Sequence, residues 1–314
     1  MSFKVNTEIA LTHLSSRKKQ TIIASLGVAI GIGAFIFMIS LIIGFNRKSD
    51  EGLFKTVPHI RIYQEDKVSQ SLVQEINKGY TAVIVNPKIS ILSKTLINPT
   101  KIIKDLKKQP DVVTVAPQVS VNLFYNNGKS QLNGLASGVN IIEANSMFDI
   151  QSTMIAGDIR NLLSLSNGVI IGVGIADKLN LQLNDNLNIT SSIGVIKIMK
   201  VIGIFQTSNS NIDQTKSYIN LTTAQQLVKQ SSSYVTDIFL NIKNPDKAPD
   251  YVPYFSEITG YKAEDWQEAN EQVMATKRTR RVLLGSISTA VLLMAAFGIY
   301  NIINMTIKEK INDI

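Results

Sequence analysis

The chain has 314 residues, 45% of them hydrophobic, and its formal net charge at pH 7 is +8. It has no cysteine and two histidines, His13 and His59. This composition excludes disulfides, iron–sulfur clusters and thiol catalysis, and it leaves a histidine-based zinc site short of ligands. The length allows a membrane part and a sizeable folded domain together.

The positive charge is concentrated beside the two most apolar segments. Residues 1–20 carry +3 and residues 277–281, KRTRR, carry +4, whereas residues 52–276 hold 20 basic and 19 acidic side chains. Basic flanks of this kind are typical of membrane interfaces and argue against a DNA-binding face. We expect KRTRR to meet anionic headgroups or to form a solvated helix face.

Residues 1–20 predict a cytoplasmic amphipathic segment that lies along the inner membrane surface, with Phe3, Ala10 and Leu14 on its apolar side. Residues 21–45 contain no charge and as a helix would cover roughly 37 Å, enough to cross a bilayer. A signal peptide is the rival interpretation, but its apolar core is usually about 7–15 residues long. We therefore predict transmembrane helix 1 over 21–45.

Small residues recur at close spacing in this first span. Gly27 and Gly31 form a GxxxG pattern, which lets helix backbones approach closely in lipid, although glycine is also common in membrane helices. We expect tight packing against another span through Gly27, Ala29, Gly31 and Ala34.

Residues 46–275 predict a large extracytoplasmic α+β domain, because runs of strands are broken by single helices. We expect two subdomains, with one inserted in the other. The expected elements are a strand over 59–63, a helix over 99–110 that Pro110 stops, a hairpin over 119–139 with Asn127-Gly128 at its turn, a strand–helix–turn–strand unit over 168–190, a strand over 195–205, a helix over 222–230 capped by Thr222 or Thr223, and a strand over 235–242.

From Ala263 onward a polar helix is expected to run straight into a second span. Residues 276–306 would form the stem and transmembrane helix 2, with the uncharged part from Val282 to about Met305, and 307–314 would start a cytoplasmic coupling segment. Two spans place both termini on one side, and the basic N-terminal segment indicates the cytoplasm. KRTRR then lies outside against the positive-inside rule, which long domains weaken.

Two short motifs resemble nucleotide-binding sequences but lack residues that such sites require. GVGIAD at 172–177 resembles the start of a dinucleotide fingerprint but lacks its third glycine and its acidic residue, so a tight strand-to-helix turn is expected. NNGKS at 126–130 lacks the earlier glycine of a phosphate loop and belongs to the hairpin. We therefore expect no catalytic residue, no metal and no cofactor in this chain, and ATP bound by another chain.

Five polar or aromatic positions before or within the second span are expected to have structural roles. Glu264 and Asp265 are expected on a solvated helix face, and Trp266 is expected to pack the stem against the domain or to sit near the membrane interface. Asn301 and Asn304 lie one turn apart in an apolar segment, where interhelical hydrogen bonding is the simpler role.

The order of these elements resembles the lipoprotein-releasing permeases of the LolC/LolE type, within the MacB/FtsX superfamily of ABC transporter membrane subunits. The matching positions are Gly27, Ala29, Gly31, Ala34, Ser40, Gly44 and Phe45 in the first span, Gly172, Ala176, Leu179 and Asp185, then Gly203, Phe205 and Asp213, and finally Trp266 and Asn270. Departures are Asn184 where glycine is usual, Ile43 where asparagine is common, and Ile311-Asn312 where a basic pair is common.

The resemblance implies a non-catalytic permease subunit in the inner membrane, with its large domain on the periplasmic side. Its implied partners are a separate ABC ATPase chain, a second identical or homologous permease, a lipoprotein cargo and a periplasmic carrier. The family has four spans, so we expect two further spans beyond Ile314. Lys308, Glu309, Lys310 and Asp313 would then begin the segment that couples the ATPase to the membrane.

The resemblance also suggests where an apolar cargo would be met. The expected contacts are on the outer halves of the two spans, although facing bulk lipid is an equally simple role for them. They are Phe37, Met38, Leu41, Ile42, Phe45, Leu283 and Ile287.

Three further functions stay open at this point. Other superfamily members export peptides or drugs, as MacB does, or regulate cell-wall hydrolases, as FtsX does. A two-span sensory receptor has the same topology, and topology alone does not decide function.

Overall fold

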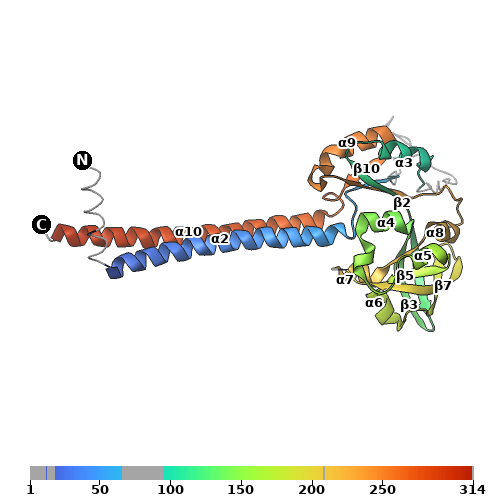
Figure 1. Ribbon diagram of the computed structural model, residues 1–314, viewed down its shortest axis with the longest axis horizontal. Coiled ribbons are helices and arrows are strands. Elements are labelled where there is room, and N and C mark those ends of the chain that lie inside the picture. Colours follow the sequence, from blue (N-terminus) through green and yellow to red (C-terminus); the bar gives the residue numbers. More distant parts are fainter. Residues whose placement is uncertain (1–11, 13–17, 66–94, 208, 313–314) are drawn as a thin grey trace, which may run out of the picture. The chain divides into compact units, whose positions relative to one another are not determined.

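The computed structural model describes residue 12 and residues 18–65, 95–207 and 209–312, which form two compact units. One unit contains two long helices, α2 (Lys18–Phe54) and α10 (Glu271–Asn312), which lie side by side in Figure 1. The other unit, residues 52–269, holds the sheet and the shorter helices. Apart from Thr12 and the first residues of α2, the predicted amphipathic segment 1–20 lies outside the described residues.

Both long helices are apolar enough to cross a membrane, over Ser25–Phe54 and Glu271–Asn301. Their 37 and 42 residues correspond to roughly 55 and 63 Å, well beyond the ~30 Å hydrocarbon core. Each helix therefore continues outside the bilayer as a stem. The predicted two spans around an α+β domain are confirmed.

The domain is built on a ten-stranded mixed sheet with nine strands in the order β10-β1-β9-β2-β3-β8-β5-β7-β4. The strands are β1 (Ile60–Tyr63), β2 (Val112–Asn127), β3 (Ser130–Val139), β4 (Met154–Gly157), β5 (Gly168–Gly172), β6 (Asn186–Ser191), β7 (Ile196–Phe205), β8 (Lys216–Asn220), β9 (Asp237–Ile242) and β10 (Lys262–Asp265). The helices are α3 (Pro99–Lys107), α4 (Ile141–Phe148), α5 (Asn161–Ser164), α6 (Val173–Leu179), α7 (Ser210–Thr215), α8 (Leu221–Leu227) and α9 (Ala248–Thr259), with 3-10 turns at Ile150–Thr153 and Pro245–Lys247.

Strand β6 closes part of this sheet into a six-stranded barrel, because it pairs with both β7 and β2. Closure leaves these strands few free edges. The barrel is filled by alternate side chains, among them Val121 and Tyr125 of β2, Ile189 of β6 and Val201 of β7, which are at most 1% exposed. Strand β5 is buried along its whole length, since its opposite face packs against a second cluster under α4 and α5.

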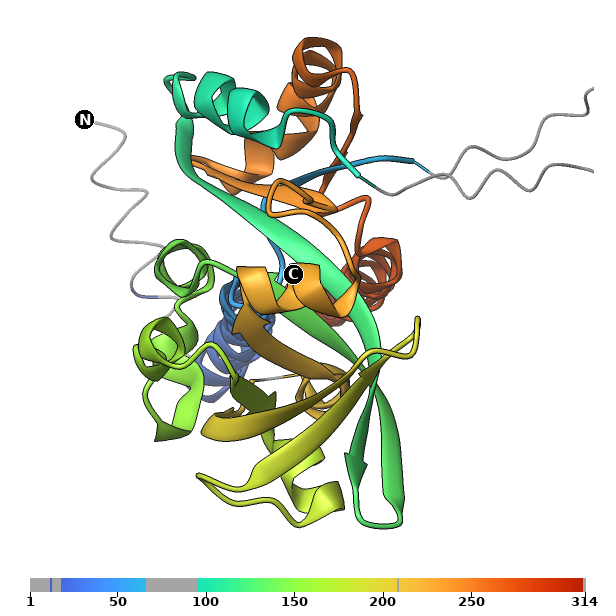
Figure 2. The same ribbon diagram turned by 90° about the vertical axis from the view of Figure 1, so that its right-hand side faces the viewer.

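Strand β2 joins the barrel to the remaining strands. Its first half pairs with β9 and its second half with β3 and β6, and Figure 2 shows it running, in green, from the helical top of the domain to the hairpin tip. Strands β9, β1 and β10 extend the sheet from that first half. Residues 118–236 thus form the barrel part, inserted between the first half of β2 and β9.

The predicted hairpin, the strands 59–63, 195–205 and 235–242 and the strand–helix–turn–strand unit are confirmed. The hairpin loop is Gly128-Lys129, one residue later than expected, since Asn127 pairs with Ser130 and Gly128 takes a φ of 58°. A glycine with positive φ suits the first position of a two-residue loop.

Two local predictions were wrong. Asn220, not Thr222 or Thr223, caps α8, because its side chain accepts the amide hydrogen of Thr222. Residues 262–265 form β10 rather than the start of a polar helix, and α10 begins only at Glu271. Glu264 and Asp265 are therefore strand residues, with Asp265 only 7% exposed, and are not on a solvated helix face.

The cap assignment predicts different effects for two neighbouring alanine substitutions. Asn220→Ala should lower the free energy of unfolding by about 0.5–2 kcal/mol, because the Thr222 amide loses its acceptor. Thr222→Ala, at an exposed position of the same turn, should change it by less than about 0.5 kcal/mol. Thermal unfolding of both variants checks this, and equal losses would contradict the assignment.

Candidate functional site

No group of three or more His, Asp or Glu side chains that could hold a metal ion occurs within the described part of the chain. GVGIAD is the predicted turn: Gly172 ends β5 and α6 starts at Val173. A Cβ on Gly172 would collide with the carbonyl of Asp213, so the glycine serves close packing. The remaining candidate residues lie in the pair of long helices, in the short connections that follow and precede them, and in the sheet.

The small residues of α2 play unequal roles in the helix pair. Gly31 is buried, and an added Cβ would collide with Ala295 on α10, whereas an added Cβ on Gly27 would meet nothing within 4 Å. Ala29 is exposed and Ala34 half-buried. Backbone approach is thus closest at Gly31, the kind of position where small residues permit helix contact in lipid.

An apolar hollow of about 380 Å³ lies between the same two helices. Gly27, Gly31 and Gly298 leave the space, and aliphatic side chains line the rest. The hollow contains little polar surface, so it fits hydrocarbon and offers no means of holding a polar ligand.

The predicted cargo contacts lie on α2 and α10. Phe37, Leu41, Phe45, Leu283 and Ile287 are exposed, and Met38 and Ile42 are half-buried. The ring of Phe45 is covered by the guanidinium of Arg280, whose carbon lies 4.2 Å from the ring centroid.

The basic segment KRTRR takes part in pairing the two helices. Lys277 forms an ion pair with Asp50 of α2 and is only 14% exposed, and Arg280 stacks on Phe45. Arg278 and Arg281 are exposed. Lys277 and Arg280 therefore contact α2, whereas Arg278 and Arg281 are free to make the headgroup contact predicted from the sequence.

The predicted ATPase-coupling residues lie at the far end of α10. The helix continues through Lys308, Glu309 and Lys310 and ends at Asn312, while Asp313 lies outside the described residues. Asn301 and Asn304 lie on the same helix, exposed and half-buried respectively.

An aromatic cluster surrounds the point where α2 gives way to the sheet. Phe54, the last residue of α2, makes edge contacts with His59 and Trp266, at 4.9 and 5.0 Å between ring centroids. Trp266 is 5% exposed, and its Nε1 donates to the Pro245 carbonyl. Its amide donates to the His59 carbonyl, so the residue after β10 is bonded to the residue before β1.

His59 is held in this cluster with its Nδ1 3.1 Å from both the amide nitrogen and the carbonyl oxygen of Ile242. Burial lowers the pKa of His59, and the hydrogen bond to Ile242 only partly offsets this. The neutral imidazole is thus the form that suits the fold.

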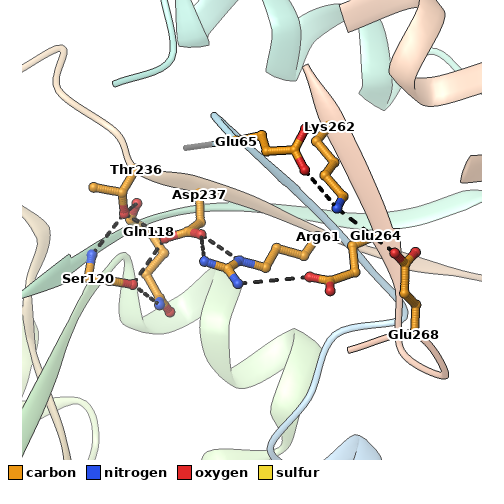
Figure 3. A network of polar contacts seen from close by, with 9 residues as sticks. All are labelled: Arg61, Glu65, Gln118, Ser120, Thr236, Asp237, Lys262, Glu264 and Glu268. Atoms are coloured by element: carbon orange, nitrogen blue, oxygen red, sulfur yellow. Dashed lines mark hydrogen bonds and ion pairs between the residues drawn. The ribbon is translucent and has the colours of Figure 1, made fainter. Parts of the chain in front are cut away.

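A network of charged and polar side chains crosses β10, β1 and β9 (Figure 3). Arg61 of β1 places Nε and Nη2 each 2.6 Å from Oδ1 of Asp237 on β9, and Nη1 3.9 Å from Oε2 of Glu264 on β10. Asp237 is almost fully buried, with 2% of its side chain exposed. Arg61 is 41% exposed, so leaving Asp237 unpaired costs less than the ~3–5 kcal/mol of a fully buried pair, but the buried carboxylate still favours the arrangement of strands that supplies its partner.

The second oxygen of Asp237 is also satisfied. Ser120 Oγ donates to Oδ2 over 3.0 Å, and Thr236 Oγ1 lies 2.6 Å away. Beside the network, Lys262 forms outer ion pairs with Glu65 and Glu268. Burial raises the pKa of Glu264, and Arg61 partly opposes this. Neither Arg61 nor Asp237 was predicted as a functional residue; the one signal in the sequence was the single Asp in the otherwise uncharged strand VTDIFLNI.

The profile of the MacB-like periplasmic core domain family matches residues 21–252. The chain belongs to this family. Relatives include the lipoprotein-releasing system transmembrane protein LolC of Buchnera aphidicola subsp. Schizaphis graminum, 24% identical over 318 residues that cover 96% of this chain and 70% of the relative. LolC of Neisseria meningitidis serogroup B is 20% identical over 331 residues, which cover 99% and 73%.

Two solved structures are also similar to this MacB-like chain. The periplasmic region of MacB from Actinobacillus actinomycetemcomitans has a TM-score of 0.41 at 10% identity and covers 68% of this chain and 92% of that one. The extracellular domain of the transporter YknZ from Gram-positive bacteria has a TM-score of 0.38 at 14% identity and covers 52% and 87%.

The family match and the LolC relatives confirm the resemblance seen in the sequence. The chain is a membrane subunit of the ABC-permease type, located in the inner membrane with its α+β domain on the periplasmic side. The motif residues are largely structural: besides Gly172, the Asp213 carboxylate accepts from the Thr207 amide at 2.8 Å, and that of Asp185 from the Gln182 amide at 2.7 Å.

The lowered pKa of His59 predicts a pH dependence of stability. The unfolded chain binds a proton more readily than the folded one, so this contribution is present above the ordinary histidine pKa and is lost as the pH falls below it. The unfolding midpoint should drop between pH 7.5 and 5.5, and the drop should be smaller in His59→Asn. Fluorescence of Trp266, the single tryptophan, reports this locally. An equal drop in both proteins would contradict the prediction.

Proposed function

We propose that this chain is the membrane subunit of a transporter that extracts lipoproteins from the outer leaflet of the inner membrane towards a periplasmic carrier. The names of the LolC relatives support the class of cargo. Hydrolysis of ATP occurs in a separate ATPase chain, and a second permease, identical or homologous, completes the membrane part. The chain itself needs no cofactor for this role.

The observation that carries the proposal is the continuity of the two long helices. α10 runs without a break from Glu271 next to the domain to Asn312, and α2 runs from Lys18 to Phe54. A continuous helix passes an axial displacement from one end to the other, since its backbone hydrogen bonds hold the rise per residue constant. Motion generated by an ATPase at the cytoplasmic end can therefore reach the domain.

Lys308, Glu309, Lys310 and Asp313 would receive that motion, as charges of both signs steer and register a docked partner. The helices would remain paired through Gly31, where an added Cβ would collide with Ala295 of α10. The exposed apolar residues of α2 and α10, Phe37, Leu41, Phe45, Leu283 and Ile287 with Met38 and Ile42, would meet the lipid part of the cargo. Their exposure, together with the hollow beside Gly31, supports a role in contacting hydrocarbon.

Export of peptides or drugs, as by MacB, is the second candidate, and the MacB-like family match favours it. The two functions differ in cargo and share the mechanical part. The sensory receptor is not favoured, because the family match covers the first span and most of the domain.

Charge reversal near the end of α10 tests the proposal. The full-length protein, its ATPase and its permease partner are reconstituted with a triacylated lipoprotein and a soluble carrier. Glu309→Lys should leave membrane level and assembly unchanged but lower lipoprotein release per ATP hydrolysed by at least about tenfold. Glu271→Lys, the same change at the other end of α10, serves as the matched control and should release normally.

Three outcomes separate the candidates. Normal release by Glu309→Lys would contradict the coupling role. Absence of lipoprotein release by the wild-type complex would contradict the proposed cargo, and ATP-dependent export of a peptide or drug by that complex would support the second candidate.

A further inference from the structure

The two membrane helices reach the sheet through neighbouring strands. Residues 55–59 separate α2 from β1, and residues 266–270 separate β10 from α10. The two strands pair antiparallel, with Ile60 opposite Asp265 and Tyr63 opposite Lys262. Because the chain is covalently continuous, a pull on either helix reaches this pair before any other part of the sheet.

The apolar pattern of β1 opposes a shift of the strand by one residue more strongly than a shift by two. Ile60 and Ile62 are fully buried on one face, and a slip by one residue would turn them to the other face. A slip by two residues keeps every side chain on its own face, because the strand period is two. It would still replace one of the two buried isoleucines by Pro58 or Gln64, so the core opposes a two-residue slip through one side chain only.

Arg61 adds a polar contact that opposes the same slip. A two-residue slip would carry its guanidinium roughly 6–7 Å along β9, away from the buried Asp237 carboxylate 2.6 Å from it. Glu65 and Glu268, which pair with Lys262, are 62% and 51% exposed, and exposed ion pairs of that kind hold strands weakly. The Arg61–Asp237 pair thus opposes a slip more strongly than these exposed ion pairs do, and it acts together with the hydrogen bonds that join His59 to Asn241 and Ile242 of β9.

We propose that Arg61 is a positioning residue of the transporter. Its pairing with Asp237 fixes the register of β1 against β9, so that movement of the membrane helices is passed to the sheet and not lost in strand slip. The force then continues from β9 into β2, which runs on into the barrel. This inference rests on the proposed function for its consequence in transport, but the register claim itself concerns the chain alone.

The test removes both charges of the pair together. Arg61→Gln/Asp237→Asn leaves no charge as deeply buried as Asp237 without its partner, since Glu264, which also loses Arg61, is 17% exposed, so the variant should fold. Arg47→Gln/Glu51→Gln removes an exposed pair within α2, 81% and 64% exposed, and is the matched control. Arg61→Lys keeps the charge but loses the forked geometry, and should give an intermediate effect even where the double variant folds poorly.

Two quantities are measured on the full chain. The first is amide hydrogen exchange of β1 and β9 in nanodiscs without the ATPase, which should speed up at least about tenfold in the double variant while β5 and β7 stay unchanged. The second is lipoprotein release per ATP hydrolysed in the complete complex, which should fall about tenfold with ATP hydrolysis retained. The control should match the wild type in both.

Unchanged exchange in β1 and β9 would overturn the register claim. Faster exchange with normal release per ATP would show a purely structural pair and would overturn the positioning role, leaving the proposed function intact. A wild-type complex that releases no lipoprotein would instead contradict the proposed function, and the exchange measurement would still decide whether Arg61 fixes the register.

Discussion

The antiparallel pairing of β1 with β10 is the constraint on which the rest of the structure depends. It brings together residues that are about 200 positions apart in the sequence, so that the domain starts and finishes on adjacent strands. Because each strand is a short connection away from a long apolar helix, the two helices are tied to one edge of one sheet. The hydrogen bond from the Trp266 amide to the His59 carbonyl and the contacts of Phe54 extend this link to the end of α2.

The domain consists of two differently stabilised parts that share β2. The barrel is closed by β6 and has a continuous apolar interior, which suits a rigid body. The part that contains β1, β9 and β10 is held by polar contacts across short strands, where Arg61, Asp237 and Glu264 replace apolar packing on one face. β10 is an edge strand of four residues, three of them charged, and such edges resist pairing with other chains. Strand β2 therefore joins a barrel with an apolar interior to a part whose strands are fixed by polar contacts.

Local sequence patterns predicted most of the helices and strands. The elements that were missed depend on contacts between residues far apart in the sequence. The hairpin follows from its turn residues and the strand–helix unit from its apolar run, so both could be found in a short window. β10 could not, because Lys262 to Asp265 is a polar stretch that becomes a strand only through its pairing with β1. Thr222 and Asn220 are both good capping residues, and the chain geometry alone decides between them.

The candidate site was predicted unevenly for the same reason. Gly31 stood out because small residues in an apolar helix indicate close packing, whereas Gly27 and Ala29 share the pattern but not the contact. Arg61 and Asp237 are 176 residues apart, and no local pattern links them. A lone carboxylate in a strand of otherwise apolar residues requires a partner, but its identity depends on the topology.

The measurement that tests the account most directly is disulfide formation between β1 and β10, which is free of background because the chain has no cysteine. Tyr63 lies directly opposite Lys262, and directly opposed strand residues have Cα atoms about 4.5–5.5 Å apart, within disulfide range. Tyr63→Cys/Lys262→Cys should therefore oxidise readily in membranes, and Tyr63→Cys/Glu264→Cys, a diagonal pair beyond that range, should oxidise slowly. Equal or faster cross-linking of the diagonal pair would contradict the pairing that joins the membrane helices to the sheet.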